Sequence, residues 1–366
     1  MELASIDCDK TFGIRVEHEG KLKDKSDACL QCALLYTTAS GHRRIRVHTI
    51  SVPVTSVMSN IFRFADLDAI INLSLKQAVR QLLDSTTCME AQNALTMACI
   101  ESLYVYRKFC ASATSAGQLI LPEPLKLLPL CTLGLVKHPL FQDGLAADER
   151  SFLFAFVNSM PCYVSVAFVC PRLFNLTSFE GNACIPDESG RVYLPRPLTL
   201  SSESVTSNGL YLLDDGRYMY LYIGSDLPTP LLDQVFNIQG DGKHQAGRYR
   251  IRHVPNQPEL ISSRINVLIG TLRKNKPNHQ PLQIISRRPP MTGAGAGPAA
   301  SPSNRAGWET FESLDENLFF SHLIEDAVHK SDVKGAKGGA SARAPNTMSY
   351  IDFLCFIHKR IQAKFL

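Results

Sequence analysis

The sequence lacks the features of a membrane-spanning or exported chain. None of its 366 residues fall in a run of about 18 consecutive apolar residues, which is the approximate minimum for a helix that crosses a bilayer. The first residues include Glu2, Asp7 and Asp9, whereas a signal peptide begins with basic residues followed by an apolar stretch. We therefore expect neither a membrane span nor a signal peptide.

Catalytic motifs are also absent. The histidines form no His-Glu-x-x-His pair and the serines no Gly-x-Ser-x-Gly motif, so neither a zinc hydrolase nor a serine hydrolase is indicated. The glycine-rich stretch Gly293–Gly297 follows no strand pattern and precedes no Lys-Ser or Lys-Thr, as a phosphate-binding loop would. The sequence predicts a protein that is not an enzyme.

The cysteines do not form a disulfide or metal-binding pattern. Eleven are present, and most lie inside apolar stretches, which is typical of reduced thiols in a cytoplasmic protein. Cys29 and Cys32 have the spacing of half a zinc site, but residues three apart on a strand point to opposite faces. No second cysteine or histidine pair follows at zinc-ligand spacing. We predict no cofactor in this region.

An acidic cluster permits two interpretations. Asp214, Asp215 and Asp226 suggest calcium, whereas Asp214-Asp215-Gly216 carries the Asp-Gly signal of a tight hairpin turn. We favour the turn.

Two basic strands are the candidate contact sites of the chain. The first carries Arg43, Arg44 and Arg46, and the second carries Arg248, Arg250 and Arg252. Guanidinium groups on one strand face can bind lipid phosphates or the carboxylates of an acidic partner. They can equally form a solvated outer face with local ion pairs, and the sequence leaves both interpretations open. The net charge of +4 is too small to indicate nucleic acid.

Hydrophobic periodicity divides the chain into segments. Alternation predicts strands at 12–16, 28–36 and 44–48, with Ile45 and Val47 facing a core. Three strands cannot close a sandwich or barrel, so we expect this domain to begin upstream of Met1. Helical spacing follows at 66–83, with Asp66 as its N-cap, and at 87–109, 125–136 and 148–157.

The second half of the chain reads as a mixed α+β domain. Strands are predicted at 163–170, 209–213, 217–223, 248–254 and 282–285, with helices at 230–236 and 259–273. Low-complexity composition predicts a flexible linker at 289–307 and a disordered insert at 330–346. Residues 308–328 and 349–366 are expected to be helices, the last opened by a Ser349 capping box. Because Phe353, Leu354, Ile357 and Ile361 form an apolar stripe, we predict that they pack back on the helical domain.

Five stretches, taken in order, resemble one known family. The five stretches are Leu34–Thr37 with Arg43–His48, Tyr106–Pro129, Ser207–Gly224, Ile324–Asp326 and Ser349–Leu354. They are similar to parts of the cargo-adaptor subunit of the COPII inner coat, the Sec24 family. The resemblance implies a multidomain α+β fold: strands ending a β-sandwich (1–54), a helical domain (55–160), a gelsolin-like domain (161–288), a linker (289–307) and C-terminal helices (308–366). The helices are expected to return to the helical domain.

The resemblance also implies a function. Members of this family select transmembrane cargo for transport from the endoplasmic reticulum to the Golgi, by binding cytoplasmic sorting signals and a partner subunit, the Sec23 family. The expected location is the cytoplasmic face of exit-site membranes and COPII vesicles, where an anionic membrane surface is a further partner. The family's zinc finger and trunk domain precede the region seen here, so zinc is expected only in that missing part. A gelsolin-type actin-binding protein remains the alternative.

Overall fold

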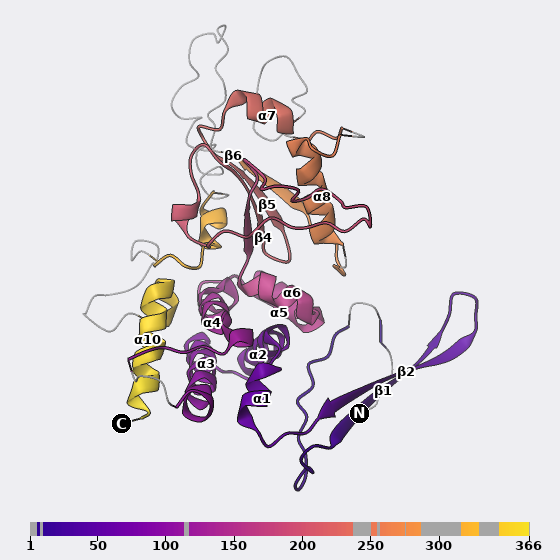
Figure 1. Ribbon diagram of the computed structural model, residues 1–366, viewed down its shortest axis with the longest axis vertical. Coiled ribbons are helices and arrows are strands. Elements are labelled where there is room, and N and C mark those ends of the chain that lie inside the picture. Colours follow the sequence, from indigo (N-terminus) through magenta and orange to yellow (C-terminus); the bar gives the residue numbers. More distant parts are fainter. Residues whose placement is uncertain are drawn as a thin grey trace.

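The computed structural model describes residues 6–7, 10–112, 117–236, 250–254, 257–274, 276–286, 316–328 and 344–365. Figure 1 shows three parts: a projecting two-stranded hairpin, a helical domain, and a sheet domain above the helices. Among the described residues, no helix combines the length and the apolar composition needed to cross a bilayer.

The helical domain contains the four helices predicted between residues 66 and 157, together with α1 and α6. Its members are α1 (Met58–Arg63), α2 (Leu67–Leu83), α3 (Cys88–Cys110), α4 (Leu128–Lys137), α5 (Ala147–Ser159) and α6 (Cys162–Val169). Asp66 caps α2 as predicted, because its carboxylate accepts the N–H of Ala69 at 3.1 Å. Thr87 and Glu90 form a reciprocal capping box that fixes the start of α3.

Helix α6 corrects the predicted strand at 163–170. The segment is apolar except for Ser165, so it carries no clear periodicity that separates a buried strand from a buried helix. Its Ser165 hydroxyl accepts a hydrogen bond from Asn72 of α2 at 2.7 Å, and Val164, Phe168 and Val169 join the helical core. The helical core therefore continues beyond the predicted boundary at residue 160.

The last helix, α10 (Tyr350–Ala363), returns to the helical domain as predicted. Its buried residues Phe353, Ile357 and Ile361 share one hydrophobic cluster with Leu103 and Leu133. Ser349 starts the helix by accepting the N–H of Asp352 at 3.2 Å. Of the predicted helix at 308–328, residues 316–321 are helical and 322–328 are not, while 308–315 lie outside the described residues. The expectation that this segment packs in the helical core is not met, because Phe319, Leu323 and Ile324 pack on the sheet.

The sheet domain has four strands in the order β3-β4-β5-β6. Its elements are β3 (Arg172–Asn175), β4 (Leu210–Asp214), β5 (Met219–Ile223), α7 (Thr229–Val235), α8 (Ile261–Arg273) and β6 (Leu282–Ser286). The pairs β3/β4 and β4/β5 are antiparallel, and β5/β6 is parallel. The predicted strand at 248–254 is wrong over its described part, which contains only an isolated bridge between Phe236 and Ile251.

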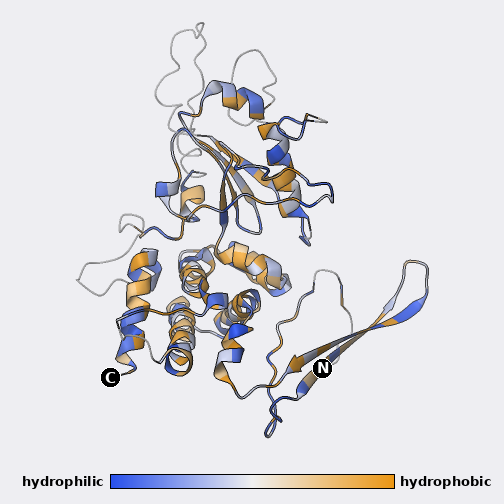
Figure 2. Ribbon diagram, viewed as in Figure 1, coloured by the Kyte–Doolittle hydropathy of each residue, from blue (hydrophilic) through white to orange (hydrophobic). Residues whose placement is uncertain are grey.

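Both faces of β4 and β5 are covered. Leu212 and Leu221 pack with Leu268 of α8 on one face. Tyr211 and Tyr222 alternate to the other face and pack with Phe319 from the C-terminal segment. Figure 2 shows these strands and α6 as strongly hydrophobic.

The hairpin consists of β1 (Asp27–Thr37) and β2 (Arg43–Pro53), joined by a turn in which the Gly41 N–H donates to the Thr38 carbonyl at 2.9 Å. Both strands are longer than predicted, and the predicted strand at 12–16 is wrong because those residues form no regular structure. Ile45 and Val47 are 69% and 52% exposed, so the expectation that they face a core is not met. Within the described residues no second sheet covers them.

Candidate functional site

The first arginine cluster lies at the start of β2, near the hairpin tip. Arg43, Arg44 and Arg46 pair in register with Thr37, Tyr36 and Leu34, and every residue of β2 is exposed. Alternation places Arg44 and Arg46 on one face and Arg43 on the other. The Arg46 guanidinium lies 5.5 Å from the centre of the Tyr36 ring. None of the three forms a salt bridge with a described residue, so their charges are available to a ligand.

The second arginine cluster lies far from the first in the structure. Arg250 and Arg252 are exposed, and the Arg252 N–H donates to the Val235 carbonyl at the end of α7, at 2.8 Å. Helix α7 and the hairpin lie at opposite ends of the molecule (Figure 1). Arg248 lies outside the described residues.

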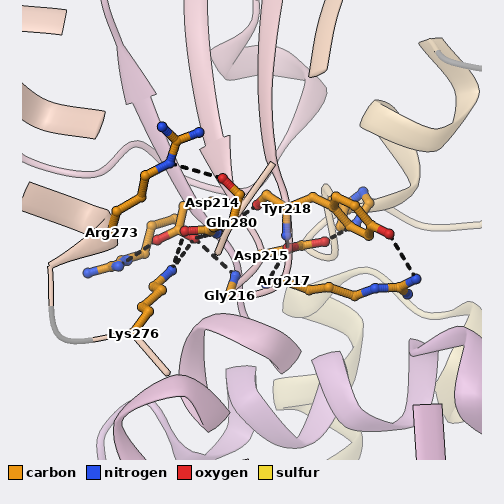
Figure 3. A network of polar contacts seen from close by, with 10 residues as sticks. Asp214, Asp215, Gly216, Arg217, Tyr218, Arg273, Lys276 and Gln280 are labelled. Atoms are coloured by element: carbon orange, nitrogen blue, oxygen red, sulfur yellow. Dashed lines mark hydrogen bonds and ion pairs between the residues drawn. The ribbon is translucent and has the colours of Figure 1, made fainter. Parts of the chain in front are cut away.

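The turn between β4 and β5 holds a buried polar network (Figure 3). The Asp214 side chain is fully buried, and one of its oxygens lies 2.5 Å from Arg172 Nη2. The other oxygen accepts hydrogen bonds from Lys276 Nζ at 2.8 Å and Gln280 Nε2 at 2.5 Å. Burial alone would raise the pKa of Asp214, but the charges of Lys276 and Arg172 overcome it and lower that pKa.

The neighbouring Asp215 closes the turn itself. Its Oδ1 accepts the backbone N–H groups of Arg217 and Tyr218 at 2.8 and 2.5 Å, and its Oδ2 lies 3.4 Å from His322. The prediction of a hairpin turn at Asp214-Asp215-Gly216 is confirmed. Both carboxylates are engaged by protein donors, and no group of three potential metal ligands occurs among the described residues.

Gly216 lies where this turn closely contacts the helical domain. It has a φ of +81°, and a Cβ at this position would lie 3.1 Å from Val164 Cγ1 and 3.2 Å from the Val164 carbonyl oxygen on α6. Both the backbone conformation and the close approach therefore favour glycine. The turn therefore packs directly on α6 and connects the sheet domain with the helical domain.

The C-terminal segment 316–328 forms a second connection between the sheet domain and the helical domain. Asp326 accepts hydrogen bonds from Ser201 Oγ and the Ser202 N–H, both at 2.7 Å. On the other side, Lys137 of α4 donates to the carbonyls of Ile324 and Asp326 at 2.7 and 2.6 Å. Burial lowers the pKa of Lys137 to about 8, although Asp326 opposes the shift. The stretch Ile324–Asp326 thus fastens the sheet domain to the helical domain.

Sequence reasoning missed the partners of Asp214. Lys276 and Gln280 are separated from it by 62 and 66 positions, and no local pattern links them. The Asp-Asp-Gly signal identified the turn but not the buried charges around it. These groups stabilise the turn between β4 and β5.

Family comparisons identify three consecutive parts of the chain. The Sec23/Sec24 beta-sandwich domain matches residues 1–55, the Sec23/Sec24 helical domain matches 66–167, and the gelsolin repeat matches 191–238.

Similar proteins share this arrangement over nearly the whole chain. Protein transport protein SEC24 B of Arabidopsis thaliana is 34% identical over 365 residues, which are 100% of this chain and 29% of that protein. Protein transport protein Sec24C of Homo sapiens is 30% identical over 364 residues, 99% of this chain and 29% of that protein. The crystal structure of the human COPII-coat protein Sec24c matches 95% of this chain and 38% of its own, with a TM-score of 0.69 and 26% identity. The chain therefore spans less than a third of the length of SEC24 B and of Sec24C.

Proposed function

The chain belongs to the Sec24 family of protein transport proteins, and on that premise we propose that it is part of a COPII coat subunit that selects transmembrane cargo. Cargo would move from the endoplasmic reticulum to the Golgi. The proposal includes no catalytic step, because a cargo-selecting coat subunit acts by binding other proteins.

One observation carries the proposal: the similarity extends over the whole chain and keeps one order of parts. Relatives named as protein transport proteins align over 99–100% of the chain, and a COPII-coat structure matches 95% of it. A single shared fold is a weak argument for function, but three domain types in one order form a much more specific one.

The partners follow from the same premise. We propose that the chain acts with a Sec23-family subunit, with cytoplasmic sorting signals of membrane cargo, and with an anionic membrane surface. The exposed Arg43, Arg44 and Arg46 support the last of these, because each cation near an anionic surface contributes about 1 kcal/mol. The proposed location is the cytoplasmic face of endoplasmic reticulum exit sites.

The alternative is a gelsolin-type actin-binding protein. The gelsolin repeat match at residues 191–238 favours it, but that match lies beside helical and β-sandwich parts of the Sec23/Sec24 type. A purified chain that sediments with actin filaments would support the alternative over the coat proposal.

Proximity labelling tests the proposal in cells. The chain, fused to a biotin ligase, should label a Sec23-family subunit and transmembrane cargo at exit sites above the level of a freely diffusing ligase. Labelling of actin without coat subunits, or labelling equal to the free ligase, would contradict it.

A further inference from the structure

A cleft opens where the sheet domain meets the helical domain. It has a volume of about 300 Å³ and lies between α5, the start of α6, the turn 216–218 and residues 276–281. We call it the junction cleft. Its apolar walls include Phe152, Phe156, Met160, Val164, Pro277 and Pro281. This volume is at the lower end of the range of small-ligand sites and suits one or two apolar side chains.

Aromatic surface in the junction cleft is open to solvent. Phe152 is 51% exposed, although it stacks on Phe156 one helical turn away, with ring centres 6.4 Å apart. Exposed aromatic side chains supply large contact area at interfaces. The cleft therefore offers an apolar surface that a ligand can remove from water.

Arg217 supplies the polar feature of the junction cleft. Its guanidinium carbon lies 4.5 Å from the centre of the Phe152 ring and 4.6 Å from that of Tyr218. Nη2 donates to Tyr218 Oη at 3.1 Å, and Arg217 forms no salt bridge with any described residue. Two flanking rings orient the guanidinium and reduce its hydration, which strengthens its attraction for a carboxylate.

The charges around the junction cleft are unbalanced. Arg217, Lys276 and His279 line it, and no carboxylate is among the lining residues. Lys276 is paired with Asp214, but Asp214 also faces Arg172, so two cations share one anion. Asp215 lies against His322 in a neighbouring pocket. A ligand that enters the junction cleft therefore meets a positive potential, which favours an anion.

The walls of the junction cleft are already in place. The Asp214 network holds Lys276 and Gln280 against the turn within the sheet domain, and the close contact of Gly216 with α6 joins the two domains at the base of the cleft. A preformed site spares a ligand the cost of ordering the protein.

We propose that the junction cleft binds a short peptide segment of a partner protein, in which an apolar side chain is followed closely by an acidic one. The apolar side chain packs on Phe152 and Phe156, and the carboxylate accepts hydrogen bonds from Arg217. This inference rests on the proposed function, because it gives the coat subunit a specific recognition site for acidic peptide segments.

Immobilised peptide libraries test the proposal with the purified full chain. One library fixes Leu or Phe followed by Asp or Glu and randomises the other positions; the second replaces the acid by Asn or Gln; the third is proline-rich and uncharged. The acidic library should retain the chain at least about tenfold more strongly than the amide library, since hydrogen bonds to an ionised group are roughly twice as strong as neutral ones.

Matched variants locate the binding. Arg217→Ala and Phe152→Ser should each reduce retention on the acidic library about tenfold, while Arg217→Lys should keep part of it. Arg191→Ala and Phe109→Ser alter an exposed arginine and an exposed phenylalanine elsewhere and should change nothing. Phe152 is exposed, so its replacement leaves the fold intact, which circular dichroism melting verifies.

Several outcomes overturn the proposal: no retention on any library, equal retention on the acidic and amide libraries, preference for the proline-rich library, or binding unaffected by both cleft variants. The assay contains neither coat partner nor membrane, so its failure is distinct from a failure of the proximity-labelling experiment.

Discussion

The two antiparallel hairpins of this chain are alike locally and opposite in their surroundings. Every residue of β4 and β5 is buried, whereas every residue of β2 is exposed. Helices α7 and α8 cover one face of β4–β5, and the C-terminal segment covers the other. Figure 2 shows the far end of β1–β2 as hydrophilic. Local sequence thus specifies strand pairing, but distant segments decide which hairpin becomes core.

This difference has energetic consequences. Burial of a Leu, Ile or Val side chain contributes about 1.5–3 kcal/mol, so β4 and β5 anchor the sheet domain. A two-stranded hairpin alone is marginally stable in water. We expect the β1–β2 hairpin to tolerate changes that the β4–β5 hairpin does not.

The largest effect should come from uncovering one face of β4–β5. A chain ending at Gly307 lacks Phe319, Leu323 and Ile324, which cover the sheet, and α10, which fills the helical core. Loss of several buried side chains should lower the melting temperature by more than about 10 °C, as circular dichroism would show.

The matched control removes the other hairpin. Lys25 N–H donates to the Val54 carbonyl at 3.0 Å, so a short linker can replace Asp27–Pro53. This deletion should leave the melting temperature of the remainder unchanged. A larger loss from this deletion than from the C-terminal truncation would refute the comparison.

Asp214→Asn should have the next largest effect, because it leaves Arg172 and Lys276 without their anion. Removal of one partner from a buried ion pair costs about 3–5 kcal/mol. Asp27→Asn, which alters an exposed carboxylate that accepts a hydrogen bond from Ser51 on β2 at 2.9 Å, should cost less than about 0.5 kcal/mol. Urea unfolding at pH 7 measures both.

The effect of Asp214→Asn should depend on pH. Because Lys276 and Arg172 outweigh burial and lower the pKa of Asp214, its stabilisation is fully present above the unfolded pKa of about 3.9. It is lost as the pH falls through the lower folded pKa. The gap between wild type and variant should therefore shrink below about pH 4. A gap that widens in acid would show that other groups dominate.

A pair of leucines compares the two hairpins directly. Leu212 of β4 is fully buried, and Leu35 of β1 is 56% exposed. Leu212→Ala should reduce the free energy of unfolding by about 3 kcal/mol, since it leaves a cavity, whereas Leu35→Ala should change it by less than about 0.5 kcal/mol. Equal losses in denaturant titrations would mean that the β1–β2 hairpin is also packed.

Sequence patterns predicted the elements whose signals are local. Asp66 and Ser349 mark helix starts, and the stripe of Phe353, Ile357 and Ile361 correctly predicted the return of α10 to the helical domain. Capping and helical periodicity depend on residues a few positions apart, so they can be read from the sequence.

Patterns failed where the outcome depends on distant partners. The segment at 163–170 is apolar except for Ser165; it forms a helix that packs on α2, where Asn72 donates a hydrogen bond to Ser165. Ile45 and Val47 alternate like core residues, yet no described element covers them. The lining of the junction cleft comes from segments around residues 156, 217 and 279, and no single window of sequence contains it.

The smallest effect on stability should come from the exposed arginines of β2. Arg43, Arg44 and Arg46 form no salt bridge with described residues, and the contact of Arg46 with Tyr36 is at the surface, where such a pair contributes about 0.5–1 kcal/mol. Replacement of all three by Ala should therefore cost at most about 1 kcal/mol.

Binding to vesicles rich in phosphatidylserine should nevertheless weaken by up to about 100-fold at low salt, because three cations each contribute about 1 kcal/mol. At high ionic strength, screening should reduce the difference. Sedimentation with vesicles at two salt concentrations measures this, with Lys21, Lys23 and Lys25 replaced by Ala as a control for total charge. If the arginine variant binds as well as wild type at low salt, or the lysine variant loses as much, the arginines are not a membrane contact.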